Sequence, residues 1–456
     1  MKIIKINNEI FREYDIRGIY GKDLDIDVAY TLGRSFGSYI QKNGNKEVII
    51  GNDNRESGPV LSNGLIKGLI ESGAHVINLG LVTTPMYYYA KKKYQIQTGI
   101  MITASHNPRE YNGFKISFNE SGNACGQAIV DFRDFTNKGD FVQGNGQLTT
   151  RNIREDYLDL ICNSIDLGTR KIKVVYDCGN GTGSIIIKDI LDMFDIDYEL
   201  LYCESDPTFP NHHPDPCVHA NMIDLGNKVK ELGYDLGIGI DGDADRVGLV
   251  DENGNIISTD LIMAIVYRYL EPNLKTRKAI FDVKCSKALI DELDRLGLEY
   301  TMNRTGNSYN NLAINEGNYD FGGEYSGHVW FTDKWPGFDD GIYAGLRLVE
   351  ILSKTNKKTS ELLEGINKYY STEELKIEVD DNKKFNIVEK VKQYCIEKNY
   401  NIVTIDGVRV NFDDSWALVR ASNTGPNLTL RFEATTEERL TEIQNEFTEI
   451  VHNYLK

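Results

Sequence analysis

The chain has 456 residues, too many for one ordinary hydrophobic core, and because domains usually contain ~100–200 residues we expect three or four. Hydrophobic residues make up 41% and charged residues 26%, which is typical of a soluble globular protein. The formal net charge of -17 argues against binding to nucleic-acid backbones or anionic membranes. An anionic substrate would therefore need a local basic pocket.

The termini and cysteines suggest a cytoplasmic protein. The first seven residues, MKIIKIN, contain too short an apolar run for a signal peptide, and no segment approaches the ~18 apolar residues that span a bilayer. The seven cysteines are odd in number, scattered and never spaced as CxxC. This spacing is typical of reduced thiols and not of a disulfide framework or a zinc site.

Strand-like apolar runs alternate with helix-length amphipathic stretches over most of the chain. This alternation predicts α/β domains with largely parallel sheets. We expect domains at residues 1–150, 151–252 and 253–368. The predicted strand–helix–strand series are 46–51, 61–72 and 74–79; 172–176, 184–194 and 198–202; and 279–283, 286–296 and 299–302.

The segment after residue 368 has a different character. Strand-like runs at 374–379, 402–405, 416–419 and 428–432 accompany helical stretches at 386–398 and 436–455. We expect residues 369–456 to form a small α+β domain. A short internal repeat, YDLG at 234–237 and YDFG at 319–322, suggests that the domains expected at 151–252 and 253–368 are related.

A serine lies in the run TASHNP at 103–108, directly after the apolar segment 99–102. A serine where a buried strand becomes a loop presents its hydroxyl at the sheet edge, where ligands of α/β proteins bind. His106 is adjacent to Ser105, and Lys115 follows in the run NGFK. A polar turn that starts a helix is the alternative reading. The run lacks GxSxG and an evident acid partner, so it does not indicate a hydrolase triad.

Three aspartates, Asp241, Asp243 and Asp245, alternate in the run DGDADR after a strand-like segment. Carboxylates spaced in this way can converge on one hard cation such as Mg²⁺ or Ca²⁺. An EF-hand is disfavoured because its sixth position is Arg246 where glycine is required. Arg246 would suit an anionic group bridging to the ion. A solvated acidic turn is the alternative.

Two later loops carry polar groups suited to a phosphorylated sugar. The run GGEYSGH at 322–328 offers Glu324 and Ser326 to sugar hydroxyls, although a plain glycine-rich turn explains it as well. The run RASNTGP at 420–426 supplies a guanidinium, two hydroxyls and an amide, the donors that a phosphate monoester needs. A hairpin turn is the alternative for this second loop.

Two further runs look functional but are predicted to be structural. DCGNGTG at 177–183 has the spacing GxGxG and lacks the acidic partner of a dinucleotide site, so we expect a tight βα turn. PNHHPD at 210–215, with Cys217 and His219 nearby, has adjacent histidines that seldom converge on one ion.

Taken together and in order, TASHNP, DGDADR, GEYSGH and RASNT resemble the α-D-phosphohexomutase superfamily. The resemblance begins at FREYDIRG, residues 11–18, and covers nearly the whole chain. The third and fourth runs are most similar to the phosphomannomutase/phosphoglucomutase branch; the phosphoglucosamine mutase branch typically has Gln where Tyr325 stands. The resemblance implies three similar α/β domains and a TATA-binding-protein-like fourth domain around one central cleft.

The resemblance also implies an activity: interconversion of hexose 6-phosphate and hexose 1-phosphate, of mannose or glucose, by a cytoplasmic enzyme that is more often a monomer. Ser105 would carry the phosphoryl group, and hexose 1,6-bisphosphate would be intermediate and activator. Mg²⁺ would be held by phospho-Ser105 with Asp241, Asp243 and Asp245. Phosphoglucosamine mutase, or an inactive sugar-phosphate-binding regulator, is the alternative.

The remaining implied site residues fall into three groups. Sugar hydroxyls would contact Glu324, Ser326 and Asn307. The phosphate that does not react would be bound by Arg420, Ser422, Asn423 and Thr424. The other positions that line the family's cleft are Tyr14, Arg17, His106, Lys115, Arg246 and Lys284, and either Lys115 or His106 would relay the proton.

One position departs from the family pattern. The run TGNS at 305–308 has Asn307 where this branch commonly has histidine, a residue considered for proton transfer. Asparagine cannot exchange a proton at neutral pH but still forms hydrogen bonds. An acid–base role at this position is therefore not expected here.

Overall fold

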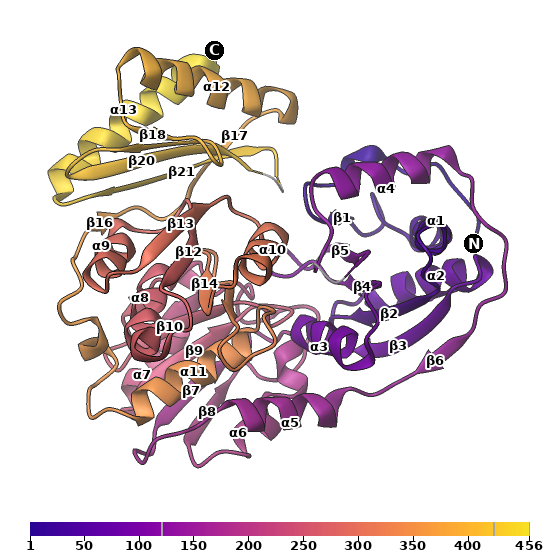
Figure 1. Cartoon of the computed structure of the whole chain (residues 1–456), viewed down its shortest axis with the longest axis horizontal. Coiled ribbons are helices and arrows are strands. Elements are labelled where there is room, and N and C mark those ends of the chain that lie inside the picture. The colour runs from indigo at the N-terminus through magenta and orange to yellow at the C-terminus, as the bar shows by residue number, and fades with distance from the viewer. Residues whose placement is uncertain (120–121, 423–424, 456) are drawn as a thin grey trace.

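The computed structural model describes residues 1–119, 122–422 and 425–455. These residues form four units, each built on one β-sheet: three sheets are mixed and the fourth is antiparallel. Figure 1 shows unit I apart on the right, units II and III together on the left, and unit IV above unit III. The predicted fold class, three α/β domains followed by an α+β domain, is confirmed.

Unit I has the strand order β1-β5-β4-β2-β3-β6, in which β2 is parallel to β3 and β4. Helices cover both faces of this sheet, so β2 reads as a continuous apolar run instead of alternating. The elements are η1 (Asn8–Ile10), β1 (Ile16–Ile19), α1 (Ile26–Lys42), β2 (Glu47–Asn52), α2 (Gly58–Glu71), β3 (His75–Leu81), α3 (Thr84–Tyr94), β4 (Gly99–Ile102), β5 (Tyr111–Ser117), α4 (Gln127–Lys138) and β6 (Leu148–Thr150).

Unit II has the strand order β11-β10-β9-β7-β8, with β7 parallel to β8 and β9. The expected helix over 184–194 is shorter, because the backbone N–H of Thr182 bonds to Gly242 at 2.8 Å and the chain first makes a 3₁₀ turn. The elements are α5 (Arg154–Ser164), β7 (Lys173–Asp177), η2 (Thr182–Ile185), α6 (Ile187–Leu191), β8 (Asp197–Leu201), η3 (His219–Met222), α7 (Ile223–Leu232), β9 (Leu236–Ile240), β10 (Val247–Asp251) and β11 (Ile256–Ile257).

Unit III has the strand order β13-β12-β14-β15, with β12 parallel to both neighbours. The apolar face of α8 packs on this sheet, and α11 packs against β9 and β10 of unit II. The elements are α8 (Thr259–Leu270), η4 (Glu271–Asn273), β12 (Lys278–Asp282), α9 (Lys287–Arg295), β13 (Glu299–Asn303), α10 (Asn307–Gly317), β14 (Phe321–Gly323), β15 (Val329–Phe331), α11 (Gly341–Ser353) and η5 (Ser360–Leu363).

The three mixed sheets share one connection pattern. In each, the first parallel strand (β2, β7 or β12) lies between the second (β3, β8 or β13) and the third (β4, β9 or β14). The third strand is followed by an antiparallel strand, β5, β10 or β15. The sequence repeat at 234–237 and 319–322 leads into β9 and β14, which are equivalent strands. Consequently the loop after the third strand has the same place in every unit.

Unit IV is an antiparallel sheet with the order β16-β21-β20-β19-β18, in which β17 also pairs with β21. Trp416 and Leu418 of β20 pack on Val283 of unit III, and Arg409 donates hydrogen bonds of 2.7 Å to the carbonyls of Val283 and Cys285. The elements are β16 (Tyr370–Ser371), β17 (Leu375–Glu378), α12 (Asp381–Glu397), β18 (Ile402–Val403), β19 (Val408–Asn411), β20 (Ser415–Ala421), β21 (Asn427–Ala434) and α13 (Glu437–Leu455).

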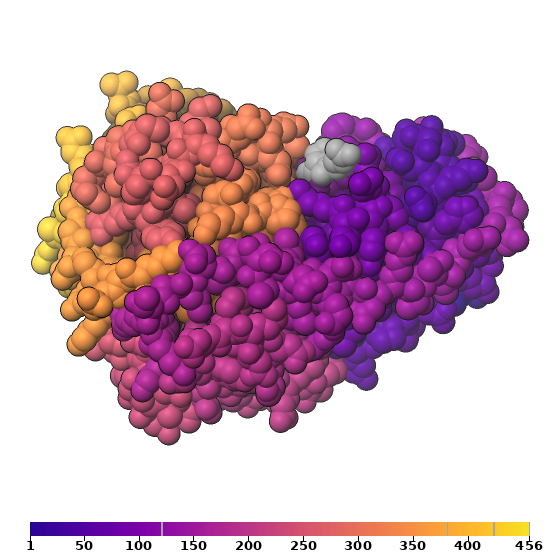
Figure 2. All heavy atoms as spheres, turned by 60° about the horizontal axis from the view of Figure 1, so that its bottom comes forward, coloured from indigo at the N-terminus to yellow at the C-terminus, as the bar shows by residue number. Residues whose placement is uncertain are grey.

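Three large apolar cores stabilise this arrangement. One core runs continuously through units I, II and III, a second lies on the other face of the unit I sheet, and a third belongs to unit IV. Figure 2 shows the surface of unit I against the orange segment of unit III. Within the described residues, no helix is both long and apolar enough to cross a bilayer.

Candidate active site

Ser105 follows β4, the third parallel strand of unit I. Its backbone has φ 49°, and only 2% of the residue is exposed. The Ser105 hydroxyl donates a hydrogen bond of 2.8 Å to Asp241 and lies 3.3 Å from Nδ1 of His106. The alternative reading of TASHNP as the start of a helix is wrong, because β5 follows this loop. A hydroxyl from unit I thus contacts a carboxylate from unit II.

A buried arginine holds the serine loop in place. Arg55 lies after β2, and its side chain extends under the loop, 3.3 Å from the Asp53 carboxylate. Its guanidinium donates hydrogen bonds of 2.6–3.0 Å to four loop carbonyls, those of Ser105, Asn107, Pro108 and Tyr111. The charge of Arg55 therefore fixes the loop without reaching the hydroxyl itself.

The acidic loop after β9 is fully buried behind the serine. Asp241, Asp243 and Asp245 have no exposed surface, and their ligand oxygens lie within 4.8 Å of one another. Burial, and then repulsion from Asp245 and Asp243, raises the pKa of Asp241 well above its usual range. Such a concentration of carboxylates requires cations to balance it.

One protein cation already lies among these carboxylates. Lys115, on β5 of unit I, bonds to Asp243 at 2.8 Å and also to Asp245. Burial works against the Lys115 charge, but Asp243 and then Asp245 outweigh it and raise the pKa of the lysine well above its usual range. Thr84 adds a hydrogen bond of 2.6 Å to Asp243. The two units are therefore joined through this cluster.

The donor set suits a divalent hard cation. Within the described residues, one buried oxygen each of Asp243 and Asp245 has no hydrogen-bond partner. Buried carboxylate oxygens without a partner are costly unless an ion takes them. All the ligand atoms are oxygens, and the Ser105 hydroxyl lies beside Asp241. Mg²⁺ prefers such oxygen ligands, and the residues fit it.

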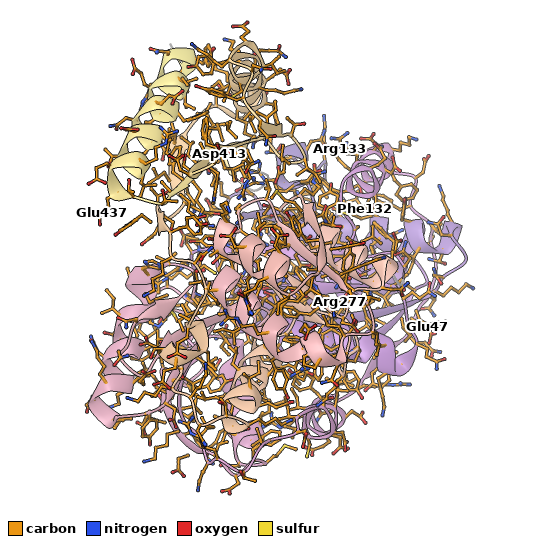
Figure 3. All side chains as sticks on the ribbon, turned by 60° about the vertical axis from the view of Figure 1, so that its left-hand side comes forward. Glu47, Phe132, Arg133, Arg277, Asp413 and Glu437 are labelled. Carbon is orange, nitrogen blue, oxygen red and sulfur yellow. The ribbon has the colours of Figure 1, made fainter. Side chains whose placement is uncertain are left out.

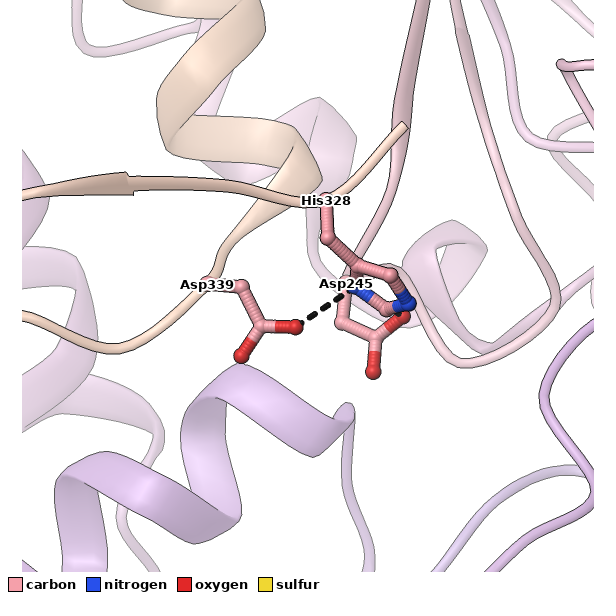
Figure 4. Close-up of side chains that lie close together, drawn as sticks. All are labelled: Asp245, His328 and Asp339. Atoms are coloured by element: carbon pink, nitrogen blue, oxygen red, sulfur yellow. Dashed lines mark hydrogen bonds and ion pairs between the residues drawn. The ribbon is translucent and has the colours of Figure 1, made fainter. Parts of the chain in front are cut away.

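A histidine and a second carboxylate lie next to the acidic loop (Figure 4). His328 Nδ1 is 2.7 Å from Asp339 and 3.6 Å from Asp245, and His328 Nε2 accepts a hydrogen bond of 3.1 Å from Arg246. Nε2 is thus the acceptor and Nδ1 carries the proton that is donated to Asp339. Asn307 also donates a hydrogen bond to Asp339 from its side-chain amide.

The glycine-rich loop after β14 presents an ordered carboxylate. Glu324 accepts hydrogen bonds from the Gly306 backbone at 3.0 Å and from Asn310 at 2.6 Å. Its other oxygen accepts a hydrogen bond of 2.8 Å from Ser326. This network fixes the carboxylate at the cavity, where it can accept hydrogen bonds from sugar hydroxyls.

Two cations that line the cavity are already paired with acids. Arg420 lies 2.9 Å from Asp406, and Lys284, which follows β12, lies 2.7 Å from Glu374. Burial works to raise the pKa of Glu374, but Lys284 outweighs it and lowers that pKa to about 2. Ser422 lies beside Arg420 at the cavity, whereas Asn423 and Thr424 fall outside the described residues.

These loops surround one cavity of 170 Å³. All four units contribute to it, and the three aspartates lie behind its wall, under Ser105. The predicted site residues that line the cavity are Tyr14, Arg17, Ser105, His106, Lys115, Arg246, Lys284, Asn307, Glu324, Ser326, Arg420 and Ser422.

Several residues of the site carry no recognisable signal in the sequence. Arg55, Glu374 and Asp339 act through neighbours far away in the chain, so no local pattern marks them. His328 is the last residue of the run GEYSGH, but only the folded structure shows that its partners are Arg246 and Asp339. In the run PNHHPD, His212 lies 2.9 Å from Asp177, at the end of β7.

Comparison with known proteins identifies the family of this chain. Profiles of the phosphoglucomutase/phosphomannomutase family match in order: α/β/α domain I at residues 8–141, domain II at 155–254, domain III at 258–369 and the C-terminal domain at 374–450. The chain belongs to the phosphoglucomutase/phosphomannomutase family.

Individual relatives cover nearly the whole chain. A phosphomannomutase/phosphoglucomutase of Pseudomonas putida is 40% identical over 96% of this chain and 95% of its own length. A phosphoglucomutase of Neisseria gonorrhoeae is 39% identical over 98% of each chain. The crystal structure of a family protein from Burkholderia thailandensis has a TM-score of 0.90 at 35% identity, covering 99% of this chain and 98% of its own.

Proposed function

We propose that this member of the family is a phosphohexomutase that interconverts the 6-phosphate and 1-phosphate of mannose, glucose or both. The observation that carries the proposal is the contact between the Ser105 hydroxyl and Asp241 at 2.8 Å, at the wall of a cavity that all four units line. Hexose phosphates would be its small-molecule partners, and a monomeric, cytoplasmic enzyme is part of the same proposal.

The domain division is proposed on the same basis. Boundaries after residues 150 and 368 follow the sequence prediction, and the spacing of the family matches supports them. We move the second boundary from residue 252 to 257, because β11 pairs with β10 and extends the second sheet. Each domain then contributes residues to the cavity.

Ser105 would act as the phosphoryl carrier. A hexose phosphate binds with its phosphate on Arg420, Ser422, Asn423, Thr424 and Lys284. Its free hydroxyl attacks phospho-Ser105: the new sugar O–P bond forms as the serine O–P bond breaks, and hexose 1,6-bisphosphate results. The bisphosphate turns, the other phosphoryl group returns to Ser105, and the isomer leaves.

The other residues would position the substrate and neutralise its charge. Glu324, Ser326 and Asn307 hold sugar hydroxyls, while Tyr14 and Arg17 complete the wall. Mg²⁺, held by Asp241, Asp243, Asp245 and the serine phosphate, would supply charge neutralisation to the transferring group.

The proton of the attacking hydroxyl needs an acceptor near Ser105. Lys115, His106 and Arg246 all line the cavity. Burial lowers the pKa of His106 well below its usual range, so this ring is neutral and can accept a proton. Lys115 stays charged while it bonds to Asp243 and Asp245, so it must first lose those contacts. Variants Lys115→Met and His106→Gln separate the two residues. General-base catalysis contributes roughly 10²–10⁴-fold, so kcat falls by about that factor in the variant that has lost the acceptor.

Replacing Ser105 by alanine tests the carrier. Wild-type enzyme supplied with Mg²⁺ and glucose 1,6-bisphosphate converts glucose 1-phosphate, and Ser105→Ala loses roughly 10³-fold or more in kcat. Ser422→Ala, in a loop that binds the non-reacting phosphate, mainly raises KM. Wild-type turnover in Ser105→Ala would disprove the mechanism.

The substrate alternatives separate by direct comparison. The kcat/KM values for mannose 1-phosphate, glucose 1-phosphate and glucosamine 1-phosphate rank the substrates. A preference for the amino sugar would make the chain a phosphoglucosamine mutase. No conversion of any of the three, with Ser105 unphosphorylated, would favour a binding protein without catalytic activity.

A further inference from the structure

A second and larger cavity, of 600 Å³, lies between α3 of unit I and α10 of unit III. It adjoins the catalytic cavity, because Asn123 and Asn307 line both. The catalytic cavity is smaller than the ~300–1,000 Å³ usual for ligand sites, and this neighbour falls within that range.

A buried lysine without a partner lines the second cavity. Lys91, on α3, is 8% exposed, and no hydrogen bond or ion pair to its ammonium is found within the described residues. Burial, and then the charge of Lys92, lowers the pKa of Lys91 to about 7. A buried cation without a counter-ion is costly, and an anionic ligand would remove that cost.

The remaining wall offers amides and aromatic rings. Asn123 bonds to Tyr88 at 2.6 Å, and Asn315 on α10 bonds to the Gly337 carbonyl at 3.1 Å. Phe338 adds an apolar ring. The carboxylate of Glu316, at the exposed rim, forms no ion pair with Lys91 in the described structure. A side-chain amide can donate a hydrogen bond to a hydroxyl group and can also accept one from it, and aromatic rings pack on the faces of sugars.

We propose that the cavity between α3 and α10 is a second binding pocket for a phosphorylated sugar, with Lys91 as its phosphate contact. The cation selects the phosphate, and the amides select the hydroxyls. The two cavities share Asn123 and Asn307 in their walls, so this pocket lies directly beside the catalytic cavity.

The pocket gives hexose 1,6-bisphosphate a place between the two half-reactions, a role that rests on the mutase function proposed above. The catalytic cavity has a volume of 170 Å³, and the pocket beside it has 600 Å³. With one phosphate held by Lys91, the bisphosphate stays bound while it turns. No bond forms or breaks in this step.

A single-turnover experiment measures this retention. Enzyme carrying ³²P on Ser105 is mixed with excess glucose 1-phosphate, and label is followed into glucose 6-phosphate and free glucose 1,6-bisphosphate. We expect Lys91→Met to raise the ratio of released to retained label about tenfold, since bonds to charged groups carry this much affinity. Lys91→Arg keeps the charge and restores most of the retention.

The control is Lys93→Met, which removes an exposed lysine of the same helix that pairs with Asp156 at 3.0 Å. Lys93→Met should release as little label as wild type. Equal release from Lys91→Met and wild type would overturn the proposal. Failure of wild-type enzyme to convert glucose 1-phosphate at all would instead refute the mutase function.

A measurement on unmodified protein covers the case in which Lys91→Met does not fold. Wild-type enzyme is treated with acetic anhydride with and without glucose 1,6-bisphosphate, and acetylation is measured by peptide mass spectrometry. Protection of Lys91, with Lys93 unprotected, supports the pocket. Equal acetylation of Lys91 with and without the bisphosphate contradicts it.

Discussion

At the scale of single residues, the position of Ser105 depends on a backbone conformation that a serine adopts only with support. Its φ of 49° lies in the left-handed region, which costs an L-residue roughly 1–2 kcal/mol. The Arg55 guanidinium offsets that cost by binding the Ser105 carbonyl at 2.8 Å together with three further carbonyls of the loop. The hydroxyl therefore points at Asp241 because of an arginine that touches no reacting atom.

Removing Arg55 tests this support. Arg55→Met leaves the loop carbonyls and the buried Asp53 without their donor, so we expect a loss of about 3–5 kcal/mol in the free energy of unfolding. Where the variant folds, kcat should fall more than KM changes, since the serine is misplaced while the phosphate loop is intact. Denaturant unfolding and steady-state kinetics measure the two effects.

Arg133→Met on α4 is the matched control, because among the described residues Arg133 pairs with its neighbour Asp134 alone, at a partly exposed position (Figure 3). It should change the free energy of unfolding by less than about 0.5 kcal/mol. If Arg55→Met were as stable and active as Arg133→Met, the serine loop would not depend on Arg55.

At the scale of elements, the equivalent strands β4, β9 and β14 deliver their loops to one cavity, and unit IV closes it. Lys284 follows β12 and pairs with Glu374, which immediately precedes β17. On the proposed function, a substrate phosphate near Lys284 would compete with Glu374. The pair fastens unit IV to unit III, and on that proposal it would also weaken phosphate binding.

Glu374→Gln separates these effects. Freeing Lys284 should lower KM for the hexose phosphate about two- to tenfold, because a charged phosphate contact is worth more than the bond to a neutral amide. Exposed Glu437→Gln on α13 (Figure 3) is the control and should leave KM unchanged. A KM that rose in Glu374→Gln would show that the carboxylate contributes to binding instead of competing.

The stability cost of Glu374→Gln should depend on pH. The folded-state pKa of Glu374 is about 2, below the ordinary 4.5, so the charged form stabilises the fold above pH 4.5. That contribution is lost as pH falls from 4.5 toward 2. Glu374→Gln should thus be less stable than wild type at pH 7, with the difference shrinking below pH 4.5 in denaturant titrations. A constant difference would exclude the ion pair.

The sequence predicted elements more completely than it predicted contacts. The strands before the serine and aspartate loops were found because apolar runs such as 99–102 are buried on both faces. The strand β19 was missed, because Val408–Asn411 is short and lacks that signal. Asn307 was identified as a departure, but its bond to Asp339 joins α10 to a segment 32 residues away, which no local pattern encodes.

At the scale of the whole molecule, charge is separated between outside and inside. The net charge is -17, yet cations from all four units line the catalytic cavity, among them Arg17, Lys115, Arg246 and Arg420. Behind them lie three fully buried aspartates from unit II, of which Asp243 and Asp245 bond to Lys115 from unit I. The cluster therefore also joins two units of the chain, and its charge balance affects the stability of the contact between them.

Adding and removing Mg²⁺ should reveal this contact between the two units without any assay of activity. In metal-free protein, repulsion among Asp241, Asp243 and Asp245 is only partly balanced by Lys115. Mg²⁺ bound to the folded state alone stabilises it by about 2.7 kcal/mol at 100 times Kd, so we expect Tm to rise by several degrees when millimolar Mg²⁺ is added after chelation.

Asp243→Asn should lose most of that rise, because it removes a carboxylate that bonds to both Lys115 and Thr84. Asp413→Asn, at an exposed position of unit IV (Figure 3), should keep the full rise. Equal Mg²⁺ responses in the two variants would place the ion elsewhere, whereas a loss confined to Asp243→Asn would tie metal binding to the junction of units I and II.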